Sequence, residues 1–355
     1  MPTFTSEFLE IVGLDLFQAA GCNKKDAKYV VEHLVESSLF GHDSHGAIRF
    51  GEYARSIRKG IFKAEAQPKI ISEAPCTAVV DGNGALGQIG ASFAINLAID
   101  KAKQNGISTV TLKNTSHIGR AGAYPLVCAR EGMLGLAFVN AGRLGYQIAP
   151  YGGIDGKLST NPIAFASPRR NSEPILVDMT TSVVAEGKIR VAINEGNPVP
   201  DGWIIDSIGN STTNPNDFRA DPPGAILPMG GVVAYKGFGL SFVVELLGGG
   251  LSGQGTAAGE RTMKSNGVLF TVYNIAHFTT MEIFYTEVES LIKHVKSSRL
   301  ADGANEILVP GEPEFRTAKL RKKKGIAVDE KTWEFICDEA RYVNINPDQW
   351  KIDDK

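Results

Sequence analysis

The sequence predicts a mixed α/β protein, of the α+β kind, with two or three structural lobes. Apolar residues recur at helical spacing in 27–39, strand and helix patterns alternate in 77–139, and 140–228 is rich in Gly, Pro, Asn, Ser and Thr. These three textures favour a helical part, a sheet-and-helix part and a region of short strands and loops. A chain of 355 residues is also too long for one core of ordinary size.

The first part of the chain is predicted to be helical. Asn23 is a suitable N-cap for the helix that carries the apolar residues of 27–39, and this helix runs into Gly41. A second helix follows, in which Arg49 and Tyr53 are four residues apart and therefore share one face.

The middle of the chain is predicted to alternate between strands and helices. The expected strands are 77–80, 108–112 and 134–139, and the expected helices are 89–104 and 119–130. Later expected elements are a strand at 175–178, a helix at 180–193, a strand at 268–273 and helices at 281–296 and 331–342. Residues 238–251 are apolar nearly all round, which predicts a buried helix, and the basic run 319–324 predicts a solvated surface.

Composition excludes several classes of partner. Lys and Arg number 37 against 39 Asp and Glu, so the formal charge of -2 gives no electrostatic reason to expect nucleic acid. Four widely spaced cysteines predict a reduced, intracellular protein. The first residues do not resemble a signal peptide, and the apolar run 238–251 is too short to span a bilayer. We therefore expect a cytoplasmic protein with no membrane partner.

A glycine motif at 82–87 is open to two interpretations. It matches GxGxxG after a predicted strand and before a predicted helix, which is the pattern of a Rossmann dinucleotide site. Residues 248–253 match the same pattern inside a predicted helix, so the match carries little weight in a chain with 39 glycines. The alternation of strands and helices that a doubly wound sheet needs also lapses beyond residue 140. The motif alone therefore does not establish a dinucleotide site.

Two short runs, 41–46 (GHDSHG), which glycines bracket, and 114–120 (NTSHIGR), which contains Gly119, hold three of the six histidines. Histidine is the natural proton carrier near neutral pH, so His117 is a candidate acid/base. Arg49 is a candidate clamp for a carboxylate because its planar guanidinium binds two oxygens together. Ser44 and His45 are candidate hydrogen-bonding groups for substrate or cofactor. The pattern favours hydride transfer to or from a 2-hydroxy or 2-keto acid.

The sequence is also compatible with other roles for these residues. Asp178 either orients a histidine or binds cofactor hydroxyls, or it is the N-cap of the helix expected at Thr180. Arg49 has the alternative role of a surface arginine. Metal binding is a rival use of His42, Asp43, His45 and His117, although the sequence provides no closed set of ligands. Serine hydrolysis has Ser44 or Ser116 available, but no nucleophile-elbow signature surrounds either.

The chain resembles the malate/L-lactate dehydrogenase family of NAD(P)-dependent oxidoreductases that lack the ordinary Rossmann fold. The resemblance extends from about residue 5 to 345, and HIGR and AEGKIRVA are most similar to the hydroxycarboxylate dehydrogenase branch. The motifs that carry it are GHDSHGAIRFGEY (41–53), VVDGNGALGQ (79–88), SHIGRAGAY (116–124), APYGG (149–153), STNPIAFASP (159–168), VDMTTSVVAEGKIRVA (177–192), LPMGG (227–231), YKGFGLSFVVELLGG (235–249) and VPGEPE (309–314). Two departures, Ser159 in place of a usual glycine and an additional VVA after Gly231, bear on the shape of a cofactor loop.

The resemblance implies a homodimer whose cofactor platform is a largely antiparallel, non-Rossmann sheet, with 82–87 as a turn. It implies domains at 1–75 (helical, substrate side), 76–310 (cofactor side) and 311–355 (helical, returning to the first lobe). His117 would be the acid/base, with Arg49 and Tyr53 at the substrate and Ser44 and His45 beside the nicotinamide of NAD or NADP. The implied cofactor contacts, with His45, are Gly119, Arg120, Ala121, Asp178, Met179, Thr180, Thr181, Ser182, Lys236, Asn266, Pro310, Gly311 and Glu312.

The expected reaction is the interconversion of a 2-hydroxy acid and its 2-keto acid, with no metal. A competing expectation is reduction of a cyclic imino acid on the same scaffold. The competing classes are a histidine-liganded metallohydrolase and a catalytically silent binding protein.

Overall fold

The structure is a computed structural model that describes residues 2–141, 146–258 and 265–350. Residues 142–145, inside the region expected to be loops, lie outside the described residues. Within the described residues, no helix combines the length and the apolar character needed to cross a membrane.

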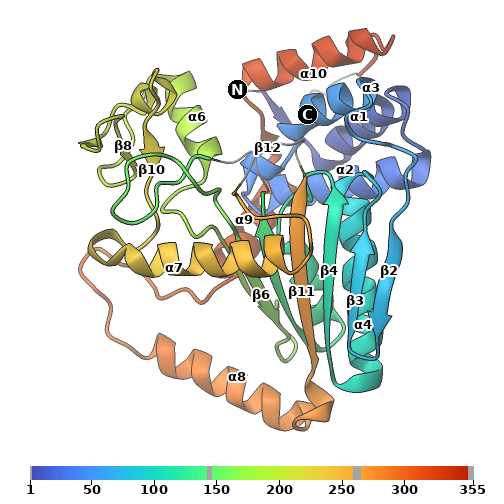
Figure 1. The fold of residues 1–355 in the computed structure, drawn as a ribbon, viewed down its shortest axis with the longest axis vertical. Coiled ribbons are helices and arrows are strands. Elements are labelled where there is room, and N and C mark those ends of the chain that lie inside the picture. The colour runs from blue at the N-terminus through green and yellow to red at the C-terminus, as the bar shows by residue number, and fades with distance from the viewer. Residues whose placement is uncertain (1, 142–145, 259–264, 351–355) are drawn as a thin grey trace.

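A seven-stranded mixed sheet forms the centre of the molecule, in the order β2-β3-β4-β11-β5-β6-β7 (Figure 1). Its strands are β2 (Lys69–Ala74), β3 (Thr77–Asp81), β4 (Ile107–Thr115), β5 (Met133–Asn140), β6 (Ile163–Ser167), β7 (Ile175–Met179) and β11 (Asn266–Asn274). β3 and β4 pair in parallel through the crossover helix α4 (Gly87–Asn105), and the other neighbouring pairs are antiparallel. The expected antiparallel sheet is therefore confirmed in part.

Helices cover both faces of this sheet. α4 and α5 (Ala123–Arg130) pack their small apolar side chains against β4, β5 and β11 in a shared core. Figure 1 shows α7 (Tyr235–Val244) in front of the strands, with α4 behind them, and a π-helical segment, Glu245–Gly250, continues α7 along the front. α8 (Met281–Lys296) follows β11 and lies at the lower edge of this view.

The helix expected at 238–251 is confirmed, but it is only partly buried within the described chain. Phe242, Val243 and Leu246 are 53%, 43% and 53% exposed. The segment meets the body of the chain along one narrow side only, where Val244, Gly248 and Gly249 are buried. Phe238 packs against the apolar cluster of the smaller part of the chain, whereas Leu240 and Leu251 are also more than a third exposed. α8 is similar, because none of its residues is buried.

A helical layer joins the two ends of the chain above the sheet (Figure 1). Its elements are α1 (Ser6–Ala19), α2 (Lys24–Leu39), α3 (Arg49–Arg58), α9 (Glu312–Lys324) and α10 (Glu330–Tyr342), with a small β1 (Thr3–Phe4) and β12 (Ile326–Ala327) ladder. The Asn23 side chain accepts a hydrogen bond from Asp26 N, so the predicted N-cap is confirmed. Arg55 and Arg58 of α3 pair with the fully buried Glu339 of α10, which ties the last helix to the first lobe.

The basic run 319–324 forms the last turns of α9, a helix that the sequence patterns did not predict. Most of its side chains are exposed, which confirms the expected solvated surface. Cations at a helix C-terminus also interact favourably with the helix dipole.

A third, smaller part of the chain has its own apolar cluster. It contains α6 (Glu186–Glu195) and a sheet of β8 (Ile204–Ile205), β9 (Ser211–Thr212) and β10 (Ala225–Ile226). The predicted helix 180–193 starts six residues late, at Glu186. The N–H groups of Thr181 and Val183 donate to Thr160 O and Leu227 O instead, which keeps this segment extended.

The helix expected at 119–130 also begins late, at Ala123. Ile118 N donates to the Asn266 side chain and Arg120 N donates to His33 Nε2. Because these donors are already bonded to side chains from distant parts of the chain, residues 116–122 stay out of the helix and cross the top of the sheet.

The glycine motif at 82–87 is a tight turn between β3 and α4. The N–H groups of Gly82 and Gly84 donate to the backbone oxygens of Lys113 and Asn114. A Cβ atom on Gly87 would stand 2.2 Å from the carbonyl oxygen of His117. The start of α4 is therefore covered by the histidine segment, and the turn leaves no room there for a pyrophosphate.

Candidate active site

A cavity of about 930 Å³ opens between the helical layer, the end of β7 and the start of α6. The loop 41–49 forms one wall, and residues 117–121 and 178–188 form two others. A volume of this size is at the upper end of the range for small-molecule and cofactor sites, roughly 300 to 1,000 Å³. Both histidine-bearing runs reach this cavity, so residues far apart in the sequence share one site.

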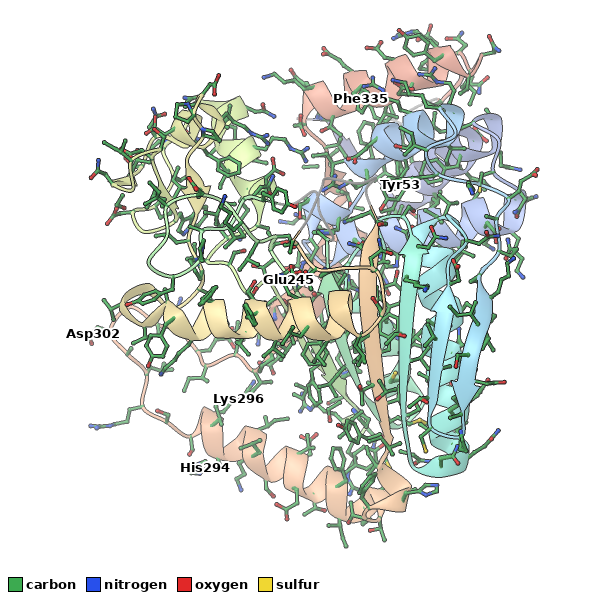
Figure 2. The ribbon with its side chains drawn as sticks, viewed as in Figure 1. Tyr53, Glu245, His294, Lys296, Asp302 and Phe335 are labelled. Atoms are coloured by element: carbon green, nitrogen blue, oxygen red, sulfur yellow. The ribbon has the colours of Figure 1, made fainter. Side chains whose placement is uncertain are left out.

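His117 lies in the cavity wall with its ring held from behind by Tyr53. Tyr53 Oη lies 2.6 Å from His117 Nδ1 and 3.2 Å from the His117 carbonyl oxygen, and Gln88 Nε2 donates to the same hydroxyl at 3.1 Å. Burial raises the pKa of the Tyr53 hydroxyl, so it stays protonated. Tyr53 is 1% exposed and lies where α3 meets the sheet (Figure 2).

His45 and Ser44 stand next to His117 on the loop that follows α2. The rings of His45 and His117 are stacked, with centroids 5.3 Å apart, and Ser44 Oγ lies 2.9 Å from His45 Nδ1. Burial, and then the adjacent His117, lower the pKa of His45 well below its usual range. His45 is therefore a neutral hydrogen-bonding group at ordinary pH.

Arg49 begins α3, one turn before Tyr53, and its guanidinium is oriented within the cavity wall. Its Nε donates to Ser44 O at 2.7 Å and its Nη1 donates to Glu52 Oε2 at 2.5 Å. These two bonds fix the plane of the guanidinium and use two of its N–H groups. The arrangement suits a fork that grips a small anion with its other donors.

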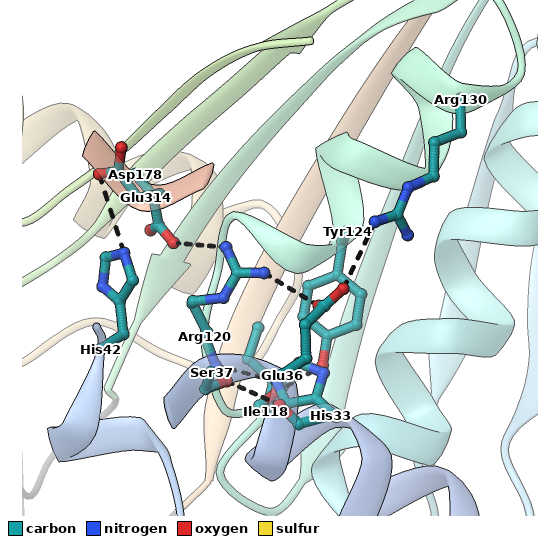
Figure 3. Close-up of polar contacts among 10 residues, drawn as sticks. All are labelled: His33, Glu36, Ser37, His42, Ile118, Arg120, Tyr124, Arg130, Asp178 and Glu314. Carbon is teal, nitrogen blue, oxygen red and sulfur yellow. Dashed lines mark hydrogen bonds and ion pairs between the residues drawn. The ribbon is translucent and has the colours of Figure 1, made fainter. Parts of the chain in front are cut away.

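A buried ionic network supports the opposite wall (Figure 3). Arg120 is 1% exposed; its Nη2 lies 3.0 Å from Glu36 Oε2, and its Nη1 lies 3.4 Å from Asp178 Oδ2. The guanidinium also stacks over the Phe40 ring. His42 lies 4.0 Å from Glu314 on the far side of this network, and burial lowers the pKa of His42. The network holds β7, α2 and residues 117–121 in fixed relation.

The structure brings most of the predicted site residues to this one cavity. Those in its wall are Ser44, His45, Arg49, His117, Gly119, Arg120, Ala121, Asp178, Met179, Thr180 and Ser182. Thr181 is buried directly behind them and bonds to Thr160 O. Asp178 is not an N-cap, since α6 begins at Glu186.

Other predicted residues lie outside the described cavity wall. Tyr53 contacts His117 from behind, and the Asn266 side chain accepts a hydrogen bond from Ile118 N. Pro310 accepts a backbone hydrogen bond from Leu176, beside β7, while the cavity wall begins three residues later at Pro313. Gly311 also packs against Leu176, and Glu312 pairs with Lys296. Lys236 is exposed on α7.

Several residues of the cavity wall were not predicted from the sequence. These are Gln147, Thr160, Lys188, Arg190, Met229 and Glu314. Gln88 and His33, which support Tyr53 and Arg120, were missed as well. Helical periodicity would have placed Arg190 on the same face of α6 as Gly187, but nothing in the sequence shows which way that face points.

Metal binding is the rival use of the two histidine runs. Among residues 2–141, 146–258 and 265–350 there is no group of three or more His, Cys, Asp or Glu side chains arranged to hold a metal ion. His45 Nδ1 bonds Ser44, and His117 Nδ1 bonds Tyr53. The two rings therefore serve in a polar hydrogen-bonded site.

The cavity brings together side chains that could transfer a proton and bind a small anion. A histidine held by a buried phenol, a second neutral histidine and an oriented guanidinium share one wall of a cavity large enough for a cofactor. These are the parts that proton-coupled redox chemistry on a carboxylic acid needs.

Comparisons identify the family. The model of the family described as malate/L-lactate dehydrogenase matches residues 4–337. Hydroxycarboxylate dehydrogenase B of Escherichia coli K12 is 36% identical over 335 residues, which cover 93% of this chain and 91% of that protein. Malate dehydrogenase from Pyrococcus horikoshii OT3 is 33% identical with a TM-score of 0.87, over 97% of this chain and 96% of that one. Delta1-piperideine-2-carboxylate reductase from Pseudomonas syringae pvar. tomato is 26% identical with a TM-score of 0.82, over 96% and 100%.

The chain therefore belongs to the malate/L-lactate dehydrogenase family, as its motifs predicted. It is an oxidoreductase of the 2-hydroxy acid dehydrogenase class, and membership implies a nicotinamide cofactor.

Proposed function

We propose that this enzyme interconverts a 2-hydroxy acid and its 2-keto acid, with His117 as the acid/base and Arg49 as the carboxylate anchor. The proposal rests on the position of both side chains in the wall of one cavity. Arg49 is the first residue of α3, and Tyr53 of the same helix contacts His117. Arg49 and Tyr53 are four residues apart on that helix, so one element sets the positions of the anchor and of the group that holds His117.

The Tyr53 hydroxyl supports a base at His117 Nε2. A phenol has one proton to donate and two lone pairs to accept. The Tyr53 proton can go to the His117 carbonyl oxygen while Oη accepts from Gln88 and from His117 Nδ1–H. This tautomer leaves the lone pair on Nε2, which takes the hydroxyl proton during oxidation. In the reverse reaction, Nε2–H returns the proton to the keto oxygen.

Arg49 binds the C1 carboxylate of the substrate. Its contacts with Ser44 O and Glu52 hold the guanidinium still before substrate arrives, so little side-chain entropy is lost on binding. A carboxylate gripped by two N–H groups has its C2 atom placed at a fixed distance from the guanidinium. Ser44 and His45 then line the space between the anchor and His117.

NAD or NADP supplies or accepts the hydride when bound in this cavity. The donor set fits such a molecule, because the backbone of 119–121 and the segment 178–182 line a cavity of about 930 Å³ next to His117. The Arg120–Asp178 pair would stiffen the part of the wall that faces the cofactor. His45, with its lowered pKa, would present a neutral ring there and add no repulsion toward the oxidised ring.

Reduction of a cyclic imino acid is the second candidate. It is supported by the likeness to the piperideine carboxylate reductase, whose fold covers nearly the whole chain. Arg49 would anchor the same carboxylate in that reaction, and His117 would donate a proton to nitrogen instead of oxygen.

We also propose that the enzyme is a homodimer, with α7 and α8 forming part of the contact. The uncovered apolar side chains of α7, of its π-helical continuation and of α8 include Phe242, Leu246, Ile283 and Leu291, each more than half exposed. Leu291→Glu should convert a dimer to a monomer in analytical ultracentrifugation. A wild-type chain that sediments as a monomer at micromolar concentration would contradict the proposal.

The apolar clusters of the structure suggest which parts of the chain bind substrate and which bind cofactor. We propose that 1–75 and 311–355 form the substrate side, since their helices share one apolar cluster, and that 76–310 forms the cofactor side. We further propose a cytoplasmic location, where the four free cysteines would stay reduced.

The test is a panel of 2-keto acids and one cyclic imino acid, assayed with NADH and with NADPH. Turnover of at least one 2-keto acid is expected, and His117→Ala should reduce kcat by roughly 100-fold or more while coenzyme binding persists. Coenzyme binding is measured separately by calorimetry. Turnover of the imino acid alone would favour the second candidate. Unchanged kcat in His117→Ala would remove His117 from the mechanism.

A further inference from the structure

Arg190 is a cation of the cavity wall without an ionic partner in the described chain. It lies on α6, is half-buried, and faces the cavity. Its Nη2 atom is fully buried and makes no hydrogen bond to any residue that the structure describes. A buried charged donor left without an acceptor costs free energy, so such a group points to a ligand that completes it.

The other arginines of the same wall already have acidic partners. Arg49 pairs with Glu52, and Arg120 pairs with Asp178 and Glu36. Lys188 also faces the cavity, but its side chain is exposed and water can solvate it. Arg190 thus differs from each of its neighbours.

The natural partner for Arg190 within α6 is bonded elsewhere. Glu186 is four residues earlier, which is the spacing at which oppositely charged side chains on a helix pair. Its carboxylate instead bonds Arg219, from the segment that precedes β10. The positive charge of Arg190 is therefore not neutralised by a carboxylate of its own helix.

The position of Arg190 favours the substrate over the cofactor. Gly187, one turn earlier on the same face of α6, packs so closely on Ser44 that a Cβ atom there would lie 2.7 Å from Ser44 Cβ. The Ser44 carbonyl oxygen in turn accepts from Arg49 Nε. The α6 face that carries Arg190 therefore adjoins the loop that orients the carboxylate anchor.

We propose that Arg190 binds a second anionic group of the substrate, at the end opposite the C1 carboxylate held by Arg49. The enzyme would then prefer dianionic 2-hydroxy and 2-keto acids, whose distal group is a carboxylate or a sulfonate, over monoanionic acids with an alkyl end. This inference rests on the proposed function. The same guanidinium chemistry would also suit the 2′-phosphate of NADP, so the experiment separates the two sources.

The test compares kcat/KM for oxaloacetate and for pyruvate, each with NADH and with NADPH, in the full-length enzyme. Arg190→Gln should lower kcat/KM for oxaloacetate by about 10- to 100-fold and leave pyruvate within about twofold, because only the dianion loses a charge-assisted bond. Arg190→Lys should recover part of the loss. Arg341→Gln removes the same charge from an exposed position on α10, outside the cavity wall, and should leave the oxaloacetate-to-pyruvate ratio unchanged.

The outcomes distinguish this inference from the function beneath it. An unchanged oxaloacetate-to-pyruvate ratio in Arg190→Gln, with normal wild-type turnover, overturns the role of Arg190 alone. A loss confined to NADPH, accompanied by weaker calorimetric binding of NADPH but not of NADH, assigns Arg190 to the cofactor and overturns the substrate proposal. A wild-type enzyme that turns over no 2-keto acid overturns the proposed function and this inference with it.

Discussion

Tyr53 Oη and His117 Nδ1 lie 2.6 Å apart across 64 residues of sequence, and Tyr53 is only 1% exposed. It joins the helical layer to the segment that crosses the top of the sheet. The orientation of the proposed acid/base therefore depends on the packing of two parts of the molecule.

Tyr53→Phe removes this bond and keeps the ring. We expect kcat to fall about 10- to 100-fold with little change in KM, because the base tautomer of His117 is no longer held. The acidic limb of the kcat profile for oxidation should also move to lower pH, since the protonated ring loses a hydrogen-bond acceptor. A purely structural role would lower the melting temperature and leave the pH profile in place, so both are measured.

Arg49→Lys tests the proposed carboxylate anchor. A lysine keeps the charge but cannot reproduce a two-pronged grip, so KM for the keto acid should rise about tenfold or more while kcat changes less. Arg55→Lys on the same helix is the control, because Arg55 pairs with Glu339 away from the cavity. Unaltered kinetics in Arg49→Lys would contradict the anchor.

Arg120→Met tests the buried ionic network behind the proposed cofactor side of the cavity. Arg120 is 1% exposed and pairs with Glu36 and Asp178, so its loss leaves buried acidic charge uncompensated. The free energy of unfolding should fall by about 3 to 5 kcal/mol in urea denaturation. Arg130→Met is the matched control, because Arg130 contacts the same Glu36 from a side chain that is 56% exposed. That exposed pair should contribute about 1 kcal/mol or less.

Stability should fall as the pH drops below about 6.5, in part through His33. Burial, and then the charge of Arg120, lower the pKa of His33 to about 3. Between these two pH values, His33 is therefore protonated in the unfolded chain and neutral in the folded chain. The free energy of unfolding is highest above the unfolded pKa and declines toward pH 3, at up to about 1.4 kcal/mol per pH unit for this one group.

His33→Gln gives the corresponding measurement. Glutamine keeps a side chain that can accept from Arg120 N but does not titrate. Urea denaturation at pH 7, 6 and 5 should show a shallower dependence on pH than the wild type. An identical slope in the two proteins would assign the acid sensitivity to other groups.

Much of the site could be predicted because its residues lie in short runs. Ser44, His45 and Arg49 are neighbours in sequence, and so are His117, Gly119 and Arg120, so finding one residue of a run located the others. Gln88 and Arg190 could not be found in this way. Each reaches the site from a helix whose face toward the cavity is set only by packing against distant segments.

Errors in element boundaries have a related cause. Residues 119–122 and 180–185 have helix-compatible patterns, but Arg120 N bonds His33, and Thr181 N bonds Thr160. These partners come from other parts of the chain, so local propensity could not anticipate them. The apolar run 238–251 suggested burial because the sequence shows that its side chains are hydrophobic. The sequence does not show which part of the protein packs against them.

The sequence by itself determined the periodic helices and strands, the two histidine runs and the family, because each of these is written in local order and spacing. Only the tertiary structure decided that Tyr53 holds His117, that the His117 backbone covers the turn at 82–87, and that Arg190 faces the cavity without an acidic partner. The physical reason is that hydrogen bonds, burial and charge pairing depend on distance in space. Those distances arise when α3, α4, α6 and the sheet pack together.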